Sequence, residues 1–318
     1  MDKVILYGMG EYLKKYGQDI FKKYSVVGVS DIDEHKSMEV LKLFSDKLYS
    51  CEVIKVSELK GKCNNCDYVL ITAGRYGELA KYLIDYIGLK AEKIRVYLSP
   101  AGGDISFYGE YNEDAIIDGI IEKAAIAPTQ IHYLDVGSND PIKNNNSYYL
   151  YSHGASGCLV DPLEEFQYAS MISRPRDQFI KAAVSDVSKD DPVYFYVCDN
   201  PALSSLYDNH RKRWDGLTNN GLREKVEVKV IGINDIMEKM ETSPEIIFID
   251  AEGEDIRIAQ AIDYGKYAPL IVCVEICGYT AKDVEEFVSF MKKKGYVLYT
   301  NVKNVNYIFV KEGMLETR

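Results

Sequence analysis

The chain is poor in positive charge and lacks the features that mark membrane-spanning and secreted proteins. Its 318 residues carry 38 Lys and Arg against 49 Asp and Glu, a net charge of −11. This argues against a general nucleic-acid binder, because such proteins need a basic face to displace counterions. No apolar run approaches the roughly 18–20 residues of a membrane span, and the first residues lack the pattern of a signal peptide. Seven cysteines, an odd number, do not suggest a disulfide framework. We therefore expect a cytoplasmic protein with free thiols.

The acidic residues are concentrated after residue 100. Residues 1–100 hold 16 basic and 14 acidic side chains, whereas residues 101–318 hold 22 and 35. A step of this size indicates two units with different surfaces, and 318 residues exceed what one hydrophobic core usually serves. A proline and a glycine pair within 99–103 interrupt regular structure. We predict a small domain over 1–100 and a larger one over 104–318.

Apolar runs alternate with helical spacing in both segments, which predicts two α/β domains with parallel sheets. The strands expected in the first lie near 4–7, 26–29, 53–56, 68–72 and 94–97. Those expected in the second lie near 131–136, 157–160, 179–184, 246–249, 270–276, 296–300 and 307–310.

The end of the second segment carries most of the information about fold. Its last two strands are joined by a polar turn, which predicts an antiparallel hairpin on an otherwise parallel sheet. A seven-stranded sheet closed in this way is the layout of Rossmann-like methyltransferases. The runs at 193–197 and 226–230 predict an inserted hairpin or edge pair.

Polar residues follow the strand at 131–136. The strand carries Asp135 near its end, Gly137 permits a tight turn beside a ligand, and Asn139 follows. The phosphate-binding pattern GxGxxG is absent, and an acid beside a glycine turn suits a ligand with ammonium and ribose groups. An ordinary strand-to-helix turn would look similar. The next strand ends in Asp161, placed to accept hydrogen bonds from ribose hydroxyls or to cap the following helix.

A second group of acids follows the strand at 246–249. Asp250 and Glu252 lie at its end, and carboxylates so close together raise one another's pKa or share a cation. Either outcome would help to remove a proton from a hydroxyl nucleophile. Glu275 ends the next apolar strand, where an acid needs a partner. The sequence does not decide whether a metal is bound.

Taken in order, these segments resemble the FkbM-type methyltransferases, S-adenosylmethionine-dependent enzymes that largely methylate hydroxyls. The resemblance covers about residues 108–311. The segments that carry it are 112–114, 134–140, 147–148, 160–162, 182–185, 204–205, 233–236 and 249–254. Pro141 stands where the family usually has glycine, and Asp161 where Glu is common.

The resemblance implies a role for each matching residue. Asp135, Gly137 and Asn139 would line the methionine end of the cofactor, Asp161 would bind its ribose, and Ala183 and Val184 would lie beside the adenine. Glu113 and Asp114 match the acidic pair that closes over the site, while Asp250 and Glu252 match the signature near the methyl acceptor. The acceptor atom implied is a hydroxyl oxygen on a saccharide or related polyhydroxy metabolite.

Further site residues are hypotheses from residue chemistry. His153 is another candidate base, although a lone histidine is more often structural. Arg211 and Arg213 lie in a basic island, residues 209–214, that could recognise an anionic methyl acceptor, with a solvated loop as the alternative. Glu275 joins them as a candidate for substrate binding.

The first segment resembles the small Rossmann-like domains attached to sugar-modifying enzymes. Gly8 and Gly10, followed by Asp31, imitate a dinucleotide fingerprint, but Leu13 stands where a third glycine is required. Two alternatives therefore stay open: a nicotinamide-dependent oxidoreductase built on residues 1–100, and a non-catalytic nucleotide-sugar-binding or scaffold protein. The partner expected for the methyltransferase is a small-molecule or glycan acceptor, without nucleic acid or a membrane span. Homo-oligomerisation stays open.

Overall fold

The chain forms two compact units. The computed structural model describes residues 1–48, 50–98, 107–185, 192–215 and 220–315, and the predicted linker at 99–103 lies outside them. The first unit comprises Met1–Ile105 with Glu165–Pro175, and the second comprises Ser106–Glu164 with Arg176–Arg318. No helix in the described part of the chain is long and apolar enough to cross a membrane. All seven cysteines are unpaired.

The first unit is built on a five-stranded parallel sheet. Its order is β3-β2-β1-β4-β5, and four strands match the apolar runs expected from the sequence, whereas the run at 53–56 contributes only the end of a two-residue strand. Their bounds are β1 (Lys3–Tyr7), β2 (Ser25–Ser30), β3 (Glu52–Val53), β4 (Tyr68–Ile71) and β5 (Ile94–Val96). The helices of this unit are α1 (Glu11–Lys23), α2 (Glu34–Leu43), α3 (Leu59–Lys62), α4 (Tyr76–Asp85) and most of α7 (Glu164–Ser173).

The second unit is built on a seven-stranded mixed sheet, as predicted. Its order is β15-β16-β14-β13-β6-β7-β8, and only the pairs β14–β16 and β15–β16 are antiparallel. The parallel strands are β6 (His132–Val136), β7 (Ser156–Asp161), β8 (Gln178–Lys181), β13 (Ile246–Ile249) and β14 (Ile271–Glu275). The hairpin strands are β15 (Tyr296–Val302) and β16 (Asn306–Lys311).

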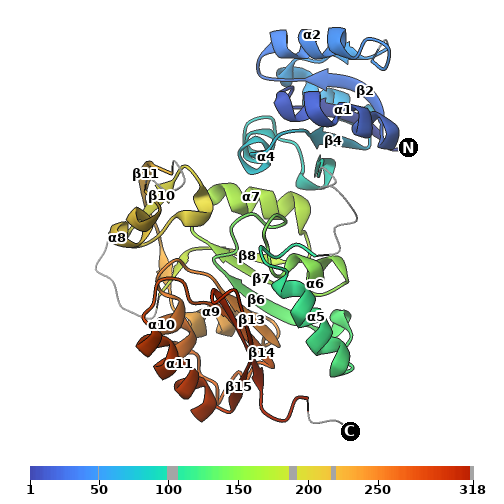
Figure 1. Ribbon diagram of the computed structural model, residues 1–318. Coiled ribbons are helices and arrows are strands. Elements are labelled where there is room, and N and C mark those ends of the chain that lie inside the picture. The colour runs from blue at the N-terminus through green and yellow to red at the C-terminus, as the bar shows by residue number, and fades with distance from the viewer. Residues whose placement is uncertain (49, 99–106, 186–191, 216–219, 316–318) are drawn as a thin grey trace. The chain divides into compact units, whose positions relative to one another are not determined.

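Helices cover both faces of this sheet (Figure 1). Alternate residues of a strand point to opposite faces, so each strand feeds two cores. On one face, strand residues such as Leu134 pack with α9 (Ile233–Lys239), α10 (Asp255–Ala261) and α11 (Ala281–Lys293). On the other, residues such as Tyr133 pack with α5 (Glu113–Lys123) and α6 (Tyr148–Ser152). A strand buried on both faces needs the continuous apolar runs that the sequence shows.

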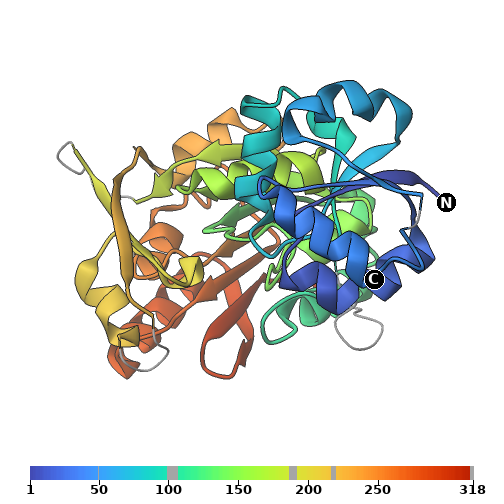
Figure 2. The ribbon, with the colours of Figure 1, turned by 90° about the horizontal axis from the view of Figure 1, so that it is seen from above.

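The segment between β8 and α9 contains the predicted edge pair. Strand β10 (Tyr194–Cys198) pairs antiparallel with β11 (Leu222–Glu227), which confirms that expectation. The end of the second run differs, because β12 (Val230–Ile231) pairs in parallel with β9 (Ala183–Val184) instead. Between β10 and β11 lies the short helix α8 (Asp208–Arg211). In Figure 2 this inserted segment, drawn in yellow, lies beside the orange and red helices of the same unit.

Candidate active site

The carboxyl ends of β6, β7 and β13 open into one pocket of the second unit. The space between its lining atoms is about 1030 Å³, open solvent included. Eight of the residues singled out from the sequence line it: Asp135, Gly137, Asn139, Asp161, Ala183, Val184, Asp250 and Glu252. Residues from strand ends far apart in the sequence meet here because parallel strands present their carboxyl ends at one sheet edge.

The turn after β6 is shaped by Gly137. Its φ is +75°, in the left-handed region, and a Cβ placed on it would lie 1.7 Å from the Asp250 carbonyl oxygen. Only a residue without a side chain allows the end of β13 to approach so closely. Gly137 therefore sets the distance between the segments that carry Asp135 and Asp250.

Asp135 is fixed from one side by the loop that precedes α6. It is only 5% exposed, and its Oδ2 accepts hydrogen bonds from Ser147 Oγ at 2.5 Å and Asn145 Nδ2 at 3.2 Å. The carboxylate is thus held in one orientation at the pocket wall.

Asp161 connects two turns at the same edge. Its Oδ2 accepts from the Asn139 backbone N–H at 3.1 Å, and its Oδ1 accepts from the Leu163 N–H at 2.8 Å. The second bond closes a turn just before α7, which begins at Glu164, so Asp161 lies two residues ahead of the position that would cap this helix. The first joins the loop after β6 to the end of β7, so both segments are held together where they line the pocket.

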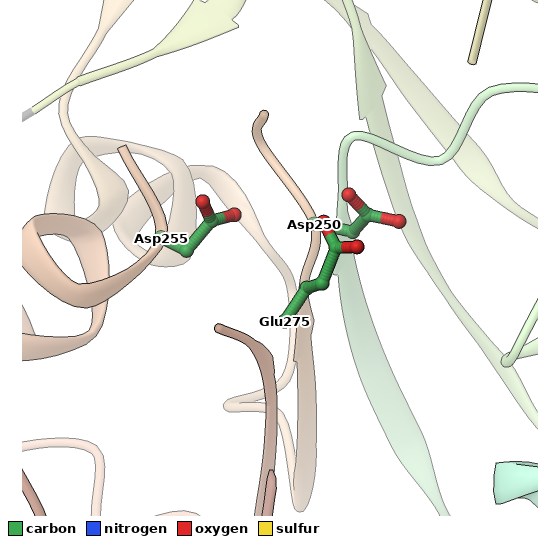
Figure 3. Close-up of side chains that lie close together, drawn as sticks. All are labelled: Asp250, Asp255 and Glu275. Carbon is green, nitrogen blue, oxygen red and sulfur yellow. The ribbon is translucent and has the colours of Figure 1, made fainter. Parts of the chain in front are cut away.

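Three acids from β13, β14 and α10 lie close together (Figure 3). Ligand atoms of Asp250, Asp255 and Glu275 lie within 4.8 Å of one another, and Asp250 and Glu275 hydrogen-bond to each other. Asp250 lines the pocket and is exposed to it, with protein atoms crowded around its other sides. Burial, followed by the charge of Glu275, raises its pKa well above the usual value. Burial also raises the pKa of Glu275 to about 8. Two carboxyl groups so placed share one proton.

Asp255 shapes the turn between Asp250 and α10. Its two oxygens accept from the backbone N–H groups of Ala251 at 2.5 Å and Gly253 at 2.9 Å, while burial raises its pKa to about 6. The three acids could contact one cation once deprotonated. The shared proton and the backbone donors already account for their arrangement.

Glu252 is held from both its backbone and its side chain. Its carbonyl oxygen accepts from Ser205 Oγ at 2.6 Å, and its Oε2 lies 2.9 Å from His210 Nε2. Burial, then the charge of Asp250, raises the pKa of Glu252 well above its usual range. Burial and the charge of Arg213 lower the pKa of His210 to about 4, so its ring is neutral near pH 7.

The hydrogen bonds also fix the tautomer of His210. Arg213 Nη1 lies 3.1 Å from His210 Nδ1, and because a guanidinium can only donate, Nδ1 must accept. The ring proton is therefore on Nε2, which donates to Glu252. This chain from Arg213 through His210 to Glu252 was not anticipated from the sequence, although 209–214 was noted as a basic island.

The two acids expected to close over the site are not among the residues that line the pocket. Glu113 is fully buried and accepts from Asn306 Nδ2 at 2.6 Å and the Tyr111 N–H at 3.0 Å. Asp114 is 1% exposed and accepts from the Tyr108 N–H at 2.5 Å. This pair shapes the entry to α5, and Asn306 and the nearby Glu110 line the pocket in its place.

His153 is exposed at the end of α6, where its Nδ1 lies 2.8 Å from the Tyr149 carbonyl oxygen. That position does not bring it to the pocket, so it offers no base there. The sequence around His153 did not indicate on which side of α6 its side chain would lie.

The two arginines of the basic island have different surroundings. The Arg211 side chain is 7% exposed and pairs with Asp208 and Asp215 at 2.8 and 2.9 Å, which makes it a structural ion pair. Arg213 is exposed and lines a second cavity, together with His210. Glu275 reaches the site through Asp250 and is not among the pocket-lining residues.

The lining of the first pocket fits S-adenosylmethionine. Its charged side chains among the described residues are all acids: Glu110, Asp135, Asp161, Asp250 and Glu252. Such a wall suits an ammonium, a sulfonium and ribose hydroxyls, and it would repel a pyrophosphate. In the described part of the chain, Ser138 Oγ and Asn146 Oδ1 are buried at this pocket without a hydrogen-bond partner, so polar groups remain for a ligand.

In the first unit, the residues that imitate a dinucleotide-binding fingerprint are already hydrogen-bonded to one another. Gly8 adopts a φ of +92° after β1, as a tight turn requires. The Asp31 carboxylate, however, accepts from the backbone N–H groups of Met9 at 2.6 Å and Asp33 at 2.9 Å. A ribose at this position would have to compete with both hydrogen bonds.

Fold and pocket together define an α/β methyltransferase unit that uses S-adenosylmethionine. A family model described as the methyltransferase FkbM domain matches residues 135–298, more than half of the chain. The chain belongs to the FkbM methyltransferase family, and this confirms the resemblance drawn from the sequence, with S-adenosylmethionine as cofactor.

The chain is also similar to several solved structures, at low sequence identity and low TM-score. A TehB-like SAM-dependent methyltransferase from Corynebacterium glutamicum is 16% identical, with a TM-score of 0.34, 67% of this chain and 91% of that chain being covered. The 1,6-didemethyltoxoflavin-N1-methyltransferase of Burkholderia thailandensis, solved with bound 1,6-didemethyltoxoflavin and S-adenosylhomocysteine, is 12% identical. Its TM-score is 0.28, with coverage of 63% and 81%. None of the curated proteins matches the chain.

Proposed function

We propose that the second unit methylates a hydroxyl oxygen, most simply on a saccharide or related polyhydroxy metabolite. The observation that carries this proposal is the position of Glu252 beside neutral His210, in the pocket that also contains Asp135, Gly137 and Asp161. A hydroxyl needs a base as it becomes a nucleophile, and a carboxylate of raised pKa is a stronger base than an ordinary one.

When bound, S-adenosylmethionine supplies a methyl group on a positively charged sulfur, and its transfer to a hydroxyl oxygen breaks the carbon–sulfur bond and releases the hydroxyl proton. Asp135 and Asp161 would bind the amine and ribose ends and thereby fix the direction of the methyl group. Glu252 would take the hydroxyl proton, while the N–H of His210 holds the receiving carboxylate in place. The pair formed by Asp250 and Glu275 keeps negative charge near the reacting centre.

The neutral parts of the pocket also support a polyhydroxy acceptor. Carboxylates and amides at the wall accept and donate hydrogen bonds to hydroxyl groups, and Asn144, Asn145, Asn146 and Asn306 contribute four amides. An acidic wall disfavours an anion at the methyl-transfer point itself.

The test is methyl transfer from labelled S-adenosylmethionine to a panel of saccharides, with the product treated with base. An ether keeps its label, whereas an ester loses it. We expect base-stable label, and Glu252→Gln should lower the turnover number about 100-fold or more. S-adenosylhomocysteine affinity should stay within a few-fold of wild type.

Glu241→Gln is the matched control, since Glu241 is exposed and lies outside the pocket; it should behave as wild type. The proposed base is wrong if Glu252→Gln transfers methyl groups at the wild-type rate with unchanged cofactor affinity.

A further inference from the structure

A second cavity of the methyltransferase unit lies beside Glu252. It is lined by Tyr207, Asn209, His210, Arg213, Arg257 and Gly278, among others, and encloses about 800 Å³ with open solvent included. His210 belongs to this cavity, and the residue that it hydrogen-bonds, Glu252, belongs to the first. The hydrogen bond between His210 and Glu252 therefore joins the wall of one cavity to the wall of the other.

Arg213 is a cation for which the described part of the chain supplies no ion-pair partner. Among the described residues, no carboxylate lies within the 4.0 Å of an ion pair, and its hydrogen bond runs to the neutral ring of His210. The neighbouring Arg211, by contrast, is neutralised by two aspartates. Because residues 101–318 contain 35 acids against 22 bases, an arginine left unpaired is notable. Most of its donors remain free for a ligand.

The fold leaves room for the guanidinium of Arg213 at Gly278. This glycine has a φ of +80°, and a Cβ placed on it would lie 1.2 Å from Arg213 Nη2 and 2.0 Å from Cζ. Contacts with Gly278 on one side and His210 on the other fix the side chain. A preorganised guanidinium loses less entropy when it binds an anion.

Arg257 supplies a second positive charge at the same cavity. It lies on α10 with its side chain 57% exposed, 3.9 Å from Glu254 Oε1, and its Nη1 donates to Tyr207 Oη at 3.4 Å. These long contacts leave its guanidinium available. The Tyr207 hydroxyl donates a hydrogen bond to the Glu254 carboxylate. This buried carboxylate therefore already has a partner other than Arg257.

We propose that Arg213 and Arg257 bind an oxyanion, a phosphate or a carboxylate, carried by the methyl acceptor, while a hydroxyl of the same molecule reaches Glu252. Guanidinium groups match the geometry of both oxyanions. The chain from Arg213 through His210 to Glu252 places the recognition of the anion and the proposed base in one hydrogen-bonded unit. This inference rests on the proposed function, because it assigns the ligand as the methyl acceptor.

The test is calorimetric titration of the full-length protein, saturated with S-adenosylhomocysteine, with inorganic phosphate and with acetate at constant ionic strength. We expect at least one of the two to bind, and the stronger one identifies the substituent. Arg213→Gln should weaken that binding about tenfold or more, as expected for the loss of a hydrogen bond to a charged group. Lys212→Gln removes the same charge one residue away, where Lys212 pairs with Asp208, and should change affinity less than twofold.

Gly278→Ala keeps every charge but takes the space of the guanidinium, which must shift, so it should weaken anion binding by less than Arg213→Gln does. Melting curves establish that each variant is folded. The inference is overturned if neither anion binds, or if Arg213→Gln and Lys212→Gln have equal effects. Failure of the protein to bind S-adenosylhomocysteine would instead contradict the proposed function.

Discussion

Replacing Gly137 by alanine should damage the methyltransferase unit at the point where β6 and β13 end. The new Cβ would lie 1.7 Å from the Asp250 carbonyl oxygen, whereas Cβ atoms essentially never come within 3.0 Å of such a neighbour. The two segments must therefore separate by more than 1 Å. A non-glycine residue in the left-handed region costs roughly 1–2 kcal/mol, and overpacking typically costs about 1–3 kcal/mol. The expected loss is about 2–5 kcal/mol.

Calorimetric melting, together with titration of S-adenosylhomocysteine, measures both consequences. We expect a lower melting temperature for the transition of the second unit and weaker ligand binding, because the loop after β6 lines the pocket. Gly119→Ala is the matched control: Gly119 lies inside α5 with nothing within 4 Å of the new Cβ, and it should stabilise the helix by up to about 1 kcal/mol. A Gly137→Ala protein that melts and binds like wild type would refute this reasoning.

Two further predictions concern charge and hydrogen bonding at the site. Burial raises the pKa of Glu275 to about 8, so its contribution to stability is full below the unfolded pKa and is lost as pH rises through about 8. The loss is at most roughly 5 kcal/mol. The melting temperature of Glu275→Gln should therefore fall less between pH 5 and pH 8.5 than that of the wild type. Equal falls in the two proteins would contradict the assignment. Ser147→Ala removes the 2.5 Å hydrogen bond to Asp135 and should lower the affinity for S-adenosylhomocysteine about tenfold. Ser152→Ala, an exposed change on the adjacent α6, should leave affinity unaltered, and equal affinities for both variants would rule out the role of Ser147.

The positions of the strands along the chain, and the acids at their ends, could be predicted from local sequence. Apolar runs such as 246–249 can be buried on both faces of a sheet, and parallel strands bring their carboxyl ends together. For this reason Asp135, Asp161 and Asp250 were expected at one edge, and the structure brings them into one pocket.

The contacts that complete the site depend on segments distant in sequence. His210 meets Glu252 only because the segment between β10 and β11 folds back against the start of α10, a result of tertiary packing that leaves no periodic signal. Likewise, Asn306 reaches Glu113 from the final hairpin. The charge of the 209–214 island drew attention to its arginines, although its histidine is the residue that touches the acid.

The most direct test of the central claim is calorimetric titration of S-adenosylhomocysteine into the wild-type protein and Asp161→Asn. We predict one site per chain in the wild type, weakened about tenfold or more in the variant because a charged acceptor at the pocket wall is lost. No binding by the wild type, or binding of NAD in its place, would contradict the account. Equal affinity in the two proteins would show that the ligand lies elsewhere.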